Sequence, residues 1–239
     1  TDIAALRQGR PKIAARGANV GGWRTAVQAV DTHTTGIGGD SRVVADPLGL
    51  DIGPERVVPL SLAAMQHPSV RDTLSEIERG SATHRLVPVW EFFVAGRPAA
   101  DEPLSDGDRR ILTTGTDSPV SVMDLAARVG LSDARMLNTR ALEARGILTR
   151  VGLTPTDILH VRGEFTNFDA EAAQLGCRIA ARESRTELED FVPRVYESVV
   201  RRLATTVLRK AVAEIEPGIA DDESPLARFL MDRSSSVEH

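Results

Sequence analysis

Two short segments of the sequence carry residues that could hold an anion or a metal ion. The first is the glycine-rich stretch 36–41, Gly-Ile-Gly-Gly-Asp-Ser. Glycines let backbone amides approach a phosphate closely, and the Asp that follows could hold a metal-bound phosphate. The stretch matches neither the P-loop nor the dinucleotide fingerprint, so a β-turn explains it equally well. Just upstream, Asp31 and His33 would share one face of a strand, which suits a metal pair or a hydrogen-bonded pair.

The second segment, residues 153–161, is predicted to begin a helix. Thr154 is the expected N-cap, and Pro155 lies at or near the first helical position. Asp157 and His160 are three positions apart, so their side chains meet on one helix face. There they could share a divalent metal, or the carboxylate could orient the imidazole as an acid or base. The alternative is that Asp157 caps the helix and His160 bonds a neighbour, since two residues cannot complete a metal site.

Composition limits the class of protein. The 239 residues are 41% hydrophobic and 26% charged, which is ordinary for a globular protein. The one cysteine, Cys177, excludes an internal disulfide and a cysteine-cluster zinc site. It is expected to be packed in a helix, and the alternative is a third ligand near His160. No apolar run reaches the ~18 residues of a membrane span and no signal peptide is visible, so we expect a cytoplasmic protein without a membrane partner.

The elements that must position these residues begin with a β-rich part, residues 1–103. Turns at 8–11 and 46–49 are predicted to separate short strands. A helical pattern over 61–79 is interrupted by His67-Pro68. The strongest strand candidate that follows is 86–95, where Pro88 favours an edge position or a bulge.

Residues 104–152 are predicted to form a separate winged-helix-like module, with helices at 108–113, 121–130 and 133–145 and a short strand at 147–151. Arginines on the third helix offer a rival function, because they could contact DNA phosphates. These arginines are Arg135, Arg140 and Arg145. Their spacing scatters them around the helix, and the whole chain has a net charge of −5, so we expect packing or a protein partner rather than nucleic acid.

The last part, residues 153–233, is predicted to be helical, with helices at 168–182, at 185–216 and over a last short stretch at 222–232. Residues 234–239 resemble a vector scar that runs into a cut-off His tag. The chain begins without methionine. We therefore expect a processed, truncated or excerpted sequence.

Four stretches, in order, resemble the hydantoinase/oxoprolinase A family. They are residues 1–4, 20–24, 30–41 and 153–161, and the resemblance extends over most of residues 1–215. Family members have the actin-like ATPase fold of the ribonuclease H-like type. They use ATP to open a cyclic amide such as a hydantoin or oxoproline, or for a related carboxylation, usually with a B-type partner subunit or domain.

The resemblance implies ATP with Mg²⁺ as cofactor, a small cyclic amide as substrate and a B-type hydantoinase subunit or domain as partner. It places near the nucleotide phosphates or their Mg²⁺ the residues Thr1, Asp2, Gly38, Gly39, Asp40 and Ser41. It also raises the prospect of an additional divalent metal at Asp157 and His160, with His33 as a further ligand. No catalytic residue is assigned.

The expected fold class is therefore α/β (α+β), a partial actin-like ATPase domain with a small winged-helix-like helical insertion. The glycines that should precede Thr1 and the adenosine-binding glycine segment are both absent from the sequence. For that reason we expect this piece alone not to hydrolyse ATP. A winged-helix regulator or interaction module and a pseudo-enzyme scaffold are the alternative functions.

Overall fold

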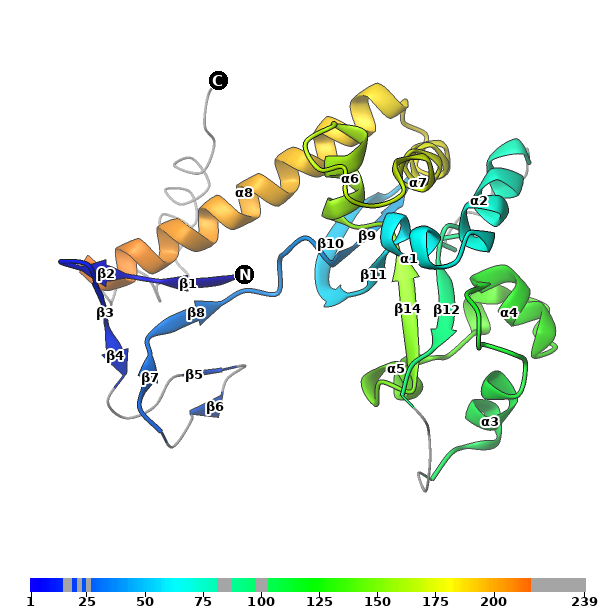
Figure 1. Ribbon diagram of the computed structural model, residues 1–239, viewed down its shortest axis with the longest axis horizontal. Coiled ribbons are helices and arrows are strands. Elements are labelled where there is room, and N and C mark those ends of the chain that lie inside the picture. The colour runs from blue at the N-terminus through cyan, green and yellow to red at the C-terminus, as the bar shows by residue number, and fades with distance from the viewer. Residues whose placement is uncertain (15–18, 21–22, 25–26, 81–86, 98–102, 216–239) are drawn as a thin grey trace. The chain divides into compact units, whose positions relative to one another are not determined.

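A computed structural model describes residues 1–14, 19–20, 23–24, 27–80, 87–97 and 103–215 (Figure 1). The protein is of mixed α/β class, with short sheets and several helices, as expected. It divides into two compact units, the first made of residues 1–38 with residues 197–239 and the second of residues 39–196. None of the described helices is long and apolar enough to cross a membrane.

The first unit consists of paired short strands and the longer, C-terminal part of a long helix. The pairs are β1 (Asp2–Ala4) with β8 (Thr32–Thr34), β2 (Leu6–Arg7) with β3 (Arg10–Pro11), β4 (Ile13–Ala14) with β7 (Ala29–Val30), and β5 (Asn19–Val20) with β6 (Trp23–Arg24). All are antiparallel. Gln8 and Gly9 have positive φ angles in the β2–β3 turn, which confirms the predicted turn at 8–11. The helix is α8 (Leu188–Ile215).

Both lysines of the chain stabilise the first unit. Lys210 of α8 lies 3.0 Å from a carboxylate oxygen of Asp31 and 3.1 Å from Glu214. Lys12 reaches the same two acids, at 3.4 Å and 3.3 Å. Asp31, predicted as half of a metal or hydrogen-bonded pair, is thus engaged with two ammonium groups. The hydrogen bond from Lys210 holds the pKa of Asp31 below its usual value.

The second unit contains a hairpin and a four-stranded sheet. The hairpin joins β9 (Ser41–Asp46) to β10 (Gly49–Arg56), and Asp46 accepts hydrogen bonds from the turn amides of Leu48 and Gly49. The predicted turn at 46–49 is confirmed. The sheet has the order β11 (Val58–Pro59), β14 (Leu148–Gly152), β12 (Phe92–Ala95), β13 (Val120–Ser121). β14 pairs parallel with β11 and antiparallel with β12, so it lies inside the sheet (Figure 1).

Helices pack around α7 (Ala170–Glu183) in the second unit. α7 contacts α1 (Leu60–Gln66), α2 (Ser69–Arg79), α6 (Pro155–Val161) and β9. The break between α1 and α2 is at the predicted Pro68. At Gly176 an added Cβ would lie 2.4 Å from a methyl carbon of Leu60, so only glycine permits this approach of α1 to α7.

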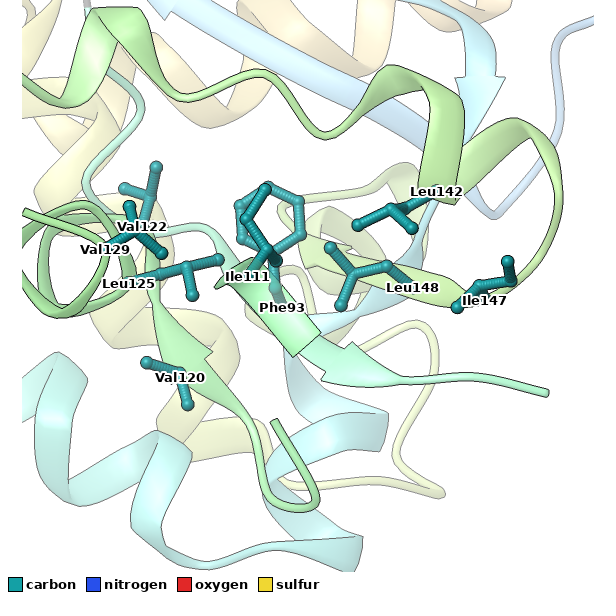
Figure 2. Close-up of a cluster of buried hydrophobic side chains, with 9 residues drawn as sticks. All are labelled: Phe93, Ile111, Val120, Val122, Leu125, Val129, Leu142, Ile147 and Leu148. Atoms are coloured by element: carbon teal, nitrogen blue, oxygen red, sulfur yellow. The ribbon is translucent and has the colours of Figure 1, made fainter. Parts of the chain in front are cut away.

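A hydrophobic cluster supports the region 104–152. Its helices are α3 (Asp106–Leu112), α4 (Val122–Arg128), the 3₁₀ turn η1 (Ala134–Met136) and α5 (Arg140–Ala144). Figure 2 shows the side chains that fill the space between them and the sheet. They are Phe93, Ile111, Val120, Val122, Leu125, Val129, Leu142, Ile147 and Leu148.

Two elements of this region differ from expectation. The predicted helix 133–145 is divided into η1 and α5, since residues 137–139 do not continue the helix. The predicted strand at 147–151 is β14, which shares a sheet with β11 and β12 rather than standing apart. The helices at 104–152 are therefore built onto the sheet of the second unit, and neither expected boundary, at 103 or 152, separates the two compact units.

The predicted strand 86–95 is also shorter than expected. Its last four residues form β12, whereas residue 91 donates its backbone N–H to the carbonyl of Pro88 in a turn. The turn that begins at Pro88 thus delays the start of the strand to Phe92, and residue 86 of the predicted strand lies outside the described residues. The predicted helices at 168–182 and 185–216 correspond to α7 and α8. The predicted helix at 222–232 and the residues 234–239 lie outside the described residues.

Candidate functional site

Asp157 is the centre of a buried hydrogen-bonded junction. Its side chain has no exposed surface. One carboxylate oxygen accepts from the backbone N–H and the hydroxyl of Ser61, at 2.9 Å and 2.6 Å. The other accepts from the N–H and hydroxyl of Thr154, at 2.9 Å and 2.8 Å, and from the N–H of Leu60 at 3.3 Å. The N-cap predicted at Thr154 is confirmed, and the structure adds a reciprocal bond that makes it a capping box; the same carboxylate also caps the start of α1.

Burial and hydrogen bonding act on Asp157 in opposite directions. Removal from water raises the pKa of this carboxyl, while the donors from Ser61 and Thr154 favour its charged form. The net direction is upward. Both oxygens are occupied by protein donors, so the geometry describes a structural carboxylate that joins two helix starts.

His160 lies one turn further along α6 in an aromatic environment. Only 5% of it is exposed, and its ring lies 5.0 Å from that of Phe165 and 5.7 Å from that of Phe168. Neither ring nitrogen has a hydrogen-bond partner among the described residues. Burial lowers the pKa of His160, although the charges of Asp157 and Asp169 oppose that effect. The imidazole is therefore held neutral at pH 7.

The metal hypothesis for Asp157, His160 and His33 stays a prediction. Within the described part of the chain, no group of three or more His, Cys, Asp or Glu side chains could hold a metal ion. The backbone of His33 pairs with Ile3 in the first unit, and its side chain lies outside what the structure describes. Cys177 is free and fully buried in α7, as packing predicts, and burial raises the pKa of its thiol.

The glycine-rich stretch reaches the start of α6. The carbonyl of Gly39 accepts from the backbone N–H of Thr156 at 3.0 Å and from its hydroxyl at 2.8 Å. A Cβ on Gly39 would lie 2.8 Å from that hydroxyl oxygen, so no larger residue fits without displacement. Asp40 forms an exposed ion pair with Arg56 at 3.4 Å, and Ser41 is fully buried at the start of β9. Residues 117 positions apart thus meet.

In the first unit, the beginning of the chain contacts the N-terminal end of the glycine-rich stretch 36–41. The hydroxyl of Thr1 donates to the carbonyl of Ile37 at 2.6 Å. The hydroxyl of Thr34 donates to the carboxylate of Asp2 at 2.6 Å, and these two residues are opposite each other in the β1–β8 pair. Thr1 and Asp2 are therefore next to residues 34–37. Gly38 and Gly39 fall on opposite sides of the division between the units.

The sequence did not predict the most buried ionic cluster. The carboxylate of Glu91 has no exposed surface and accepts hydrogen bonds from Nε of Arg42 at 2.5 Å and from Nη2 of Arg42 at 3.0 Å. Nη1 of Arg150 donates to the same carboxylate. Arg150 also donates to Glu143 from Nε at 2.9 Å and from Nη2 at 2.8 Å. A charged residue inside the apolar run Val-Trp-Glu-Phe-Phe was the one signal that could have revealed Glu91.

The electrostatics of this cluster favour its charged state. Burial alone would lower the pKa of Arg42 and of Arg150, but attraction to the neighbouring glutamates outweighs burial and raises both. Burial would raise the pKa of Glu143, and hydrogen bonds from Arg150 and Thr139 reverse that direction. The ring of Phe93 lies 4.5 Å from the guanidinium of Arg150, which links the cluster to the hydrophobic residues of Figure 2.

Comparison with known proteins adds no relative. No protein-family model matches the chain, and neither the curated proteins nor the solved structures contain a significant match.

Proposed function

We propose that the chain is part of the A-type subunit of an ATP-dependent hydantoinase/oxoprolinase-like enzyme, in a partial actin-like ATPase domain. In this proposal the segments 1–2 and 36–41 belong to the phosphate side of a site for ATP with Mg²⁺. ATP would activate a small cyclic amide for ring opening, together with a B-type partner. The proposal rests on the resemblance of the four sequence stretches.

One observation of the structure supports this function. The stretch at 36–41 and the segment at 153–161 carry the resemblance, and the contact of Gly39 with Thr156 brings them together. The contact holds the glycine-rich stretch in a fixed position against the start of α6, and a glycine-rich loop held in place is typical of phosphate sites. The buried Asp157 fixes the same helix start from inside, so the loop rests on a rigid support.

The test uses the complete enzyme assembled with its B-type partner. Release of ADP should depend on added hydantoin or 5-oxoproline. Gly39→Ala should reduce that release at least about tenfold, because the added methyl displaces the loop from Thr156. Gly49→Ala is the matched control, since a Cβ at Gly49 meets no atom within 4 Å. Absence of ADP release with every cyclic amide would refute the proposal, as would equal activity of the two variants.

The rival function, DNA binding by residues 104–152, has less support. Arg135 is paired with Asp133, and Arg145 donates to the carbonyl of Pro103. The segment expected as a recognition helix is divided into η1 and α5. Of the three arginines proposed for phosphate contact, Arg140 alone has a guanidinium with no partner among the described residues. A DNA binder should lose affinity steeply with salt, and we expect no such binding.

A further inference from the structure

The second unit contains a cavity of about 840 Å³ that the proposed function does not use. It lies between the β9–β10 hairpin, the sheet, and the segment from η1 to α5, and the cluster of Glu91, Arg42 and Arg150 forms part of its lining. Its volume is in the range of small-molecule sites. Arg140 lines it as well.

The arginines in this cavity have hydrogen-bond donors left over. A guanidinium has five N–H groups. Within the described residues, Arg42 uses three of them, on Glu91 and Glu55, which leaves one on Nη1 and one on Nη2. Arg150 uses four, on Glu91, Glu143 and a threonine hydroxyl, which leaves one on Nη1.

Glu91 and Glu143, which line the cavity, have little capacity to accept further hydrogen bonds. The carboxylate of Glu91 already accepts three guanidinium hydrogen bonds. That of Glu143 accepts two from Arg150 and one from Thr139. Arg140 is exposed and has no ionic partner among the described side chains. Glu55, which also lines the cavity, is 60% exposed and accepts one hydrogen bond, from Arg42, so it keeps some acceptor capacity. The lining nevertheless carries five arginines against three glutamates, and this excess of positive charge, together with the free N–H donors, favours an anion over a cation.

The rest of the lining is partly apolar. Val87, Pro88, Met136 and Leu137 line the cavity. Met136 is 65% exposed, so its flexible thioether is within reach of an incoming molecule. A ligand that suits both parts has an acidic group for the arginines and an apolar body for these side chains.

We infer that this cavity binds a small organic carboxylate, with its carboxylate on Arg140 and the free N–H groups of Arg42 and Arg150, and its apolar body against Met136 and Leu137. The guanidiniums of Arg42 and Arg150 are held in place by Glu91 before the ligand arrives, so their ordering costs little on binding. The inference is independent of the proposed ATP site, because none of the residues at 1–2, 36–41 or 153–161 lines the cavity.

The experiment follows the methyl group of Met136 by NMR in the full chain labelled at methionine methyl carbons. The probe is hexanoate, and Met136→Leu assigns the resonance. Hexanoate should shift the Met136 signal in a saturable way with a dissociation constant below about 1 mM. Hexanol, which has the same apolar body without the carboxylate, should bind at least about tenfold more weakly. Met65, which is 51% exposed and does not line the cavity, should not shift.

Two variants separate a binding role from a general charge effect. Arg140→Gln should weaken hexanoate binding about fivefold to tenfold. Arg110→Gln removes an exposed arginine of α3 that does not line the cavity, and should leave the affinity unchanged. The inference is wrong if Met136 shows no saturable shift, if hexanol binds as well as hexanoate, or if both variants behave alike. Tighter binding of inorganic phosphate would overturn the assignment to a carboxylate.

Discussion

Glu91→Gln should be one of the most destabilising isosteric substitutions in the second unit. The carboxylate is fully buried and accepts three hydrogen bonds from two guanidiniums, whose side chains are 20% and 15% exposed. Glutamine keeps the shape but removes the charge, and its NH₂ group is a donor placed against donors. Breaking a buried ion pair on one side costs about 3–5 kcal/mol. We expect about 3 kcal/mol for Gln, since one oxygen still accepts.

The assay is equilibrium unfolding in urea, followed by the fluorescence of Trp90, which is 1% exposed and next to the substituted residue. The chain has two tryptophans, so a Trp23→Phe background isolates this signal. Glu55→Gln is the control, because Glu55 also pairs with Arg42, at 2.7 Å, but is 60% exposed. It should cost less than about 1 kcal/mol. Equal losses for both variants would refute the claim that burial gives Glu91 its effect.

Two further substitutions test the region of α6. Asp157→Asn should lower the free energy of unfolding by about 2–3 kcal/mol in the same urea assay. The side-chain amide leaves at least one backbone N–H, of Ser61 or Thr154, without an acceptor. An unchanged stability would mean that the carboxylate is not the acceptor. His160→Phe concerns pH. Burial holds the pKa of His160 below its usual 6.5, so as pH falls the unfolded chain takes up a proton at this histidine before the folded chain does. The contribution of the neutral His160 to stability is therefore complete above about pH 6.5 and is lost as pH falls below it. The Phe variant should lose less stability than the natural protein between about pH 7.5 and about pH 5.5, and parallel losses would contradict this assignment.

Local signals predicted the elements that short-range chemistry determines. The turn at 46–49, the interruption at Pro68 and the N-cap at Thr154 each depend on contacts within a few residues, and the structure has all three. The predicted helix 133–145 and strand 86–95 were too long, because periodicity does not register where a chain turns for tertiary reasons.

The arrangement of the cavity depends on contacts that no local pattern contains. Arg42 and Arg150 are 49 and 59 residues from Glu91, and nothing in the spacing identifies them among the many arginines of the chain. Their meeting depends on the sheet order, in which β14 crosses to lie between β11 and β12. The interpretation of Asp157 was open for the same reason, since the donors from Ser61 come from 96 residues away.

Stability and binding should respond in opposite directions at Glu91. In the folded protein this carboxylate occupies three guanidinium N–H groups that an incoming carboxylate could otherwise use. Glu91→Gln removes its negative charge from the cavity lining and leaves Arg42 and Arg150 less fully compensated. The variant should therefore be less stable and yet bind hexanoate more tightly, by about threefold to tenfold, when measured by the Met136 shift under conditions where it is folded. Glu55 and Glu143 still hold the two guanidiniums in this variant, so their positions are kept. Arg140→Gln should weaken binding and leave stability little changed, because Arg140 is exposed. A ligand that uses these arginines must therefore show both effects, whereas weaker or unchanged binding by Glu91→Gln would place the carboxylate elsewhere.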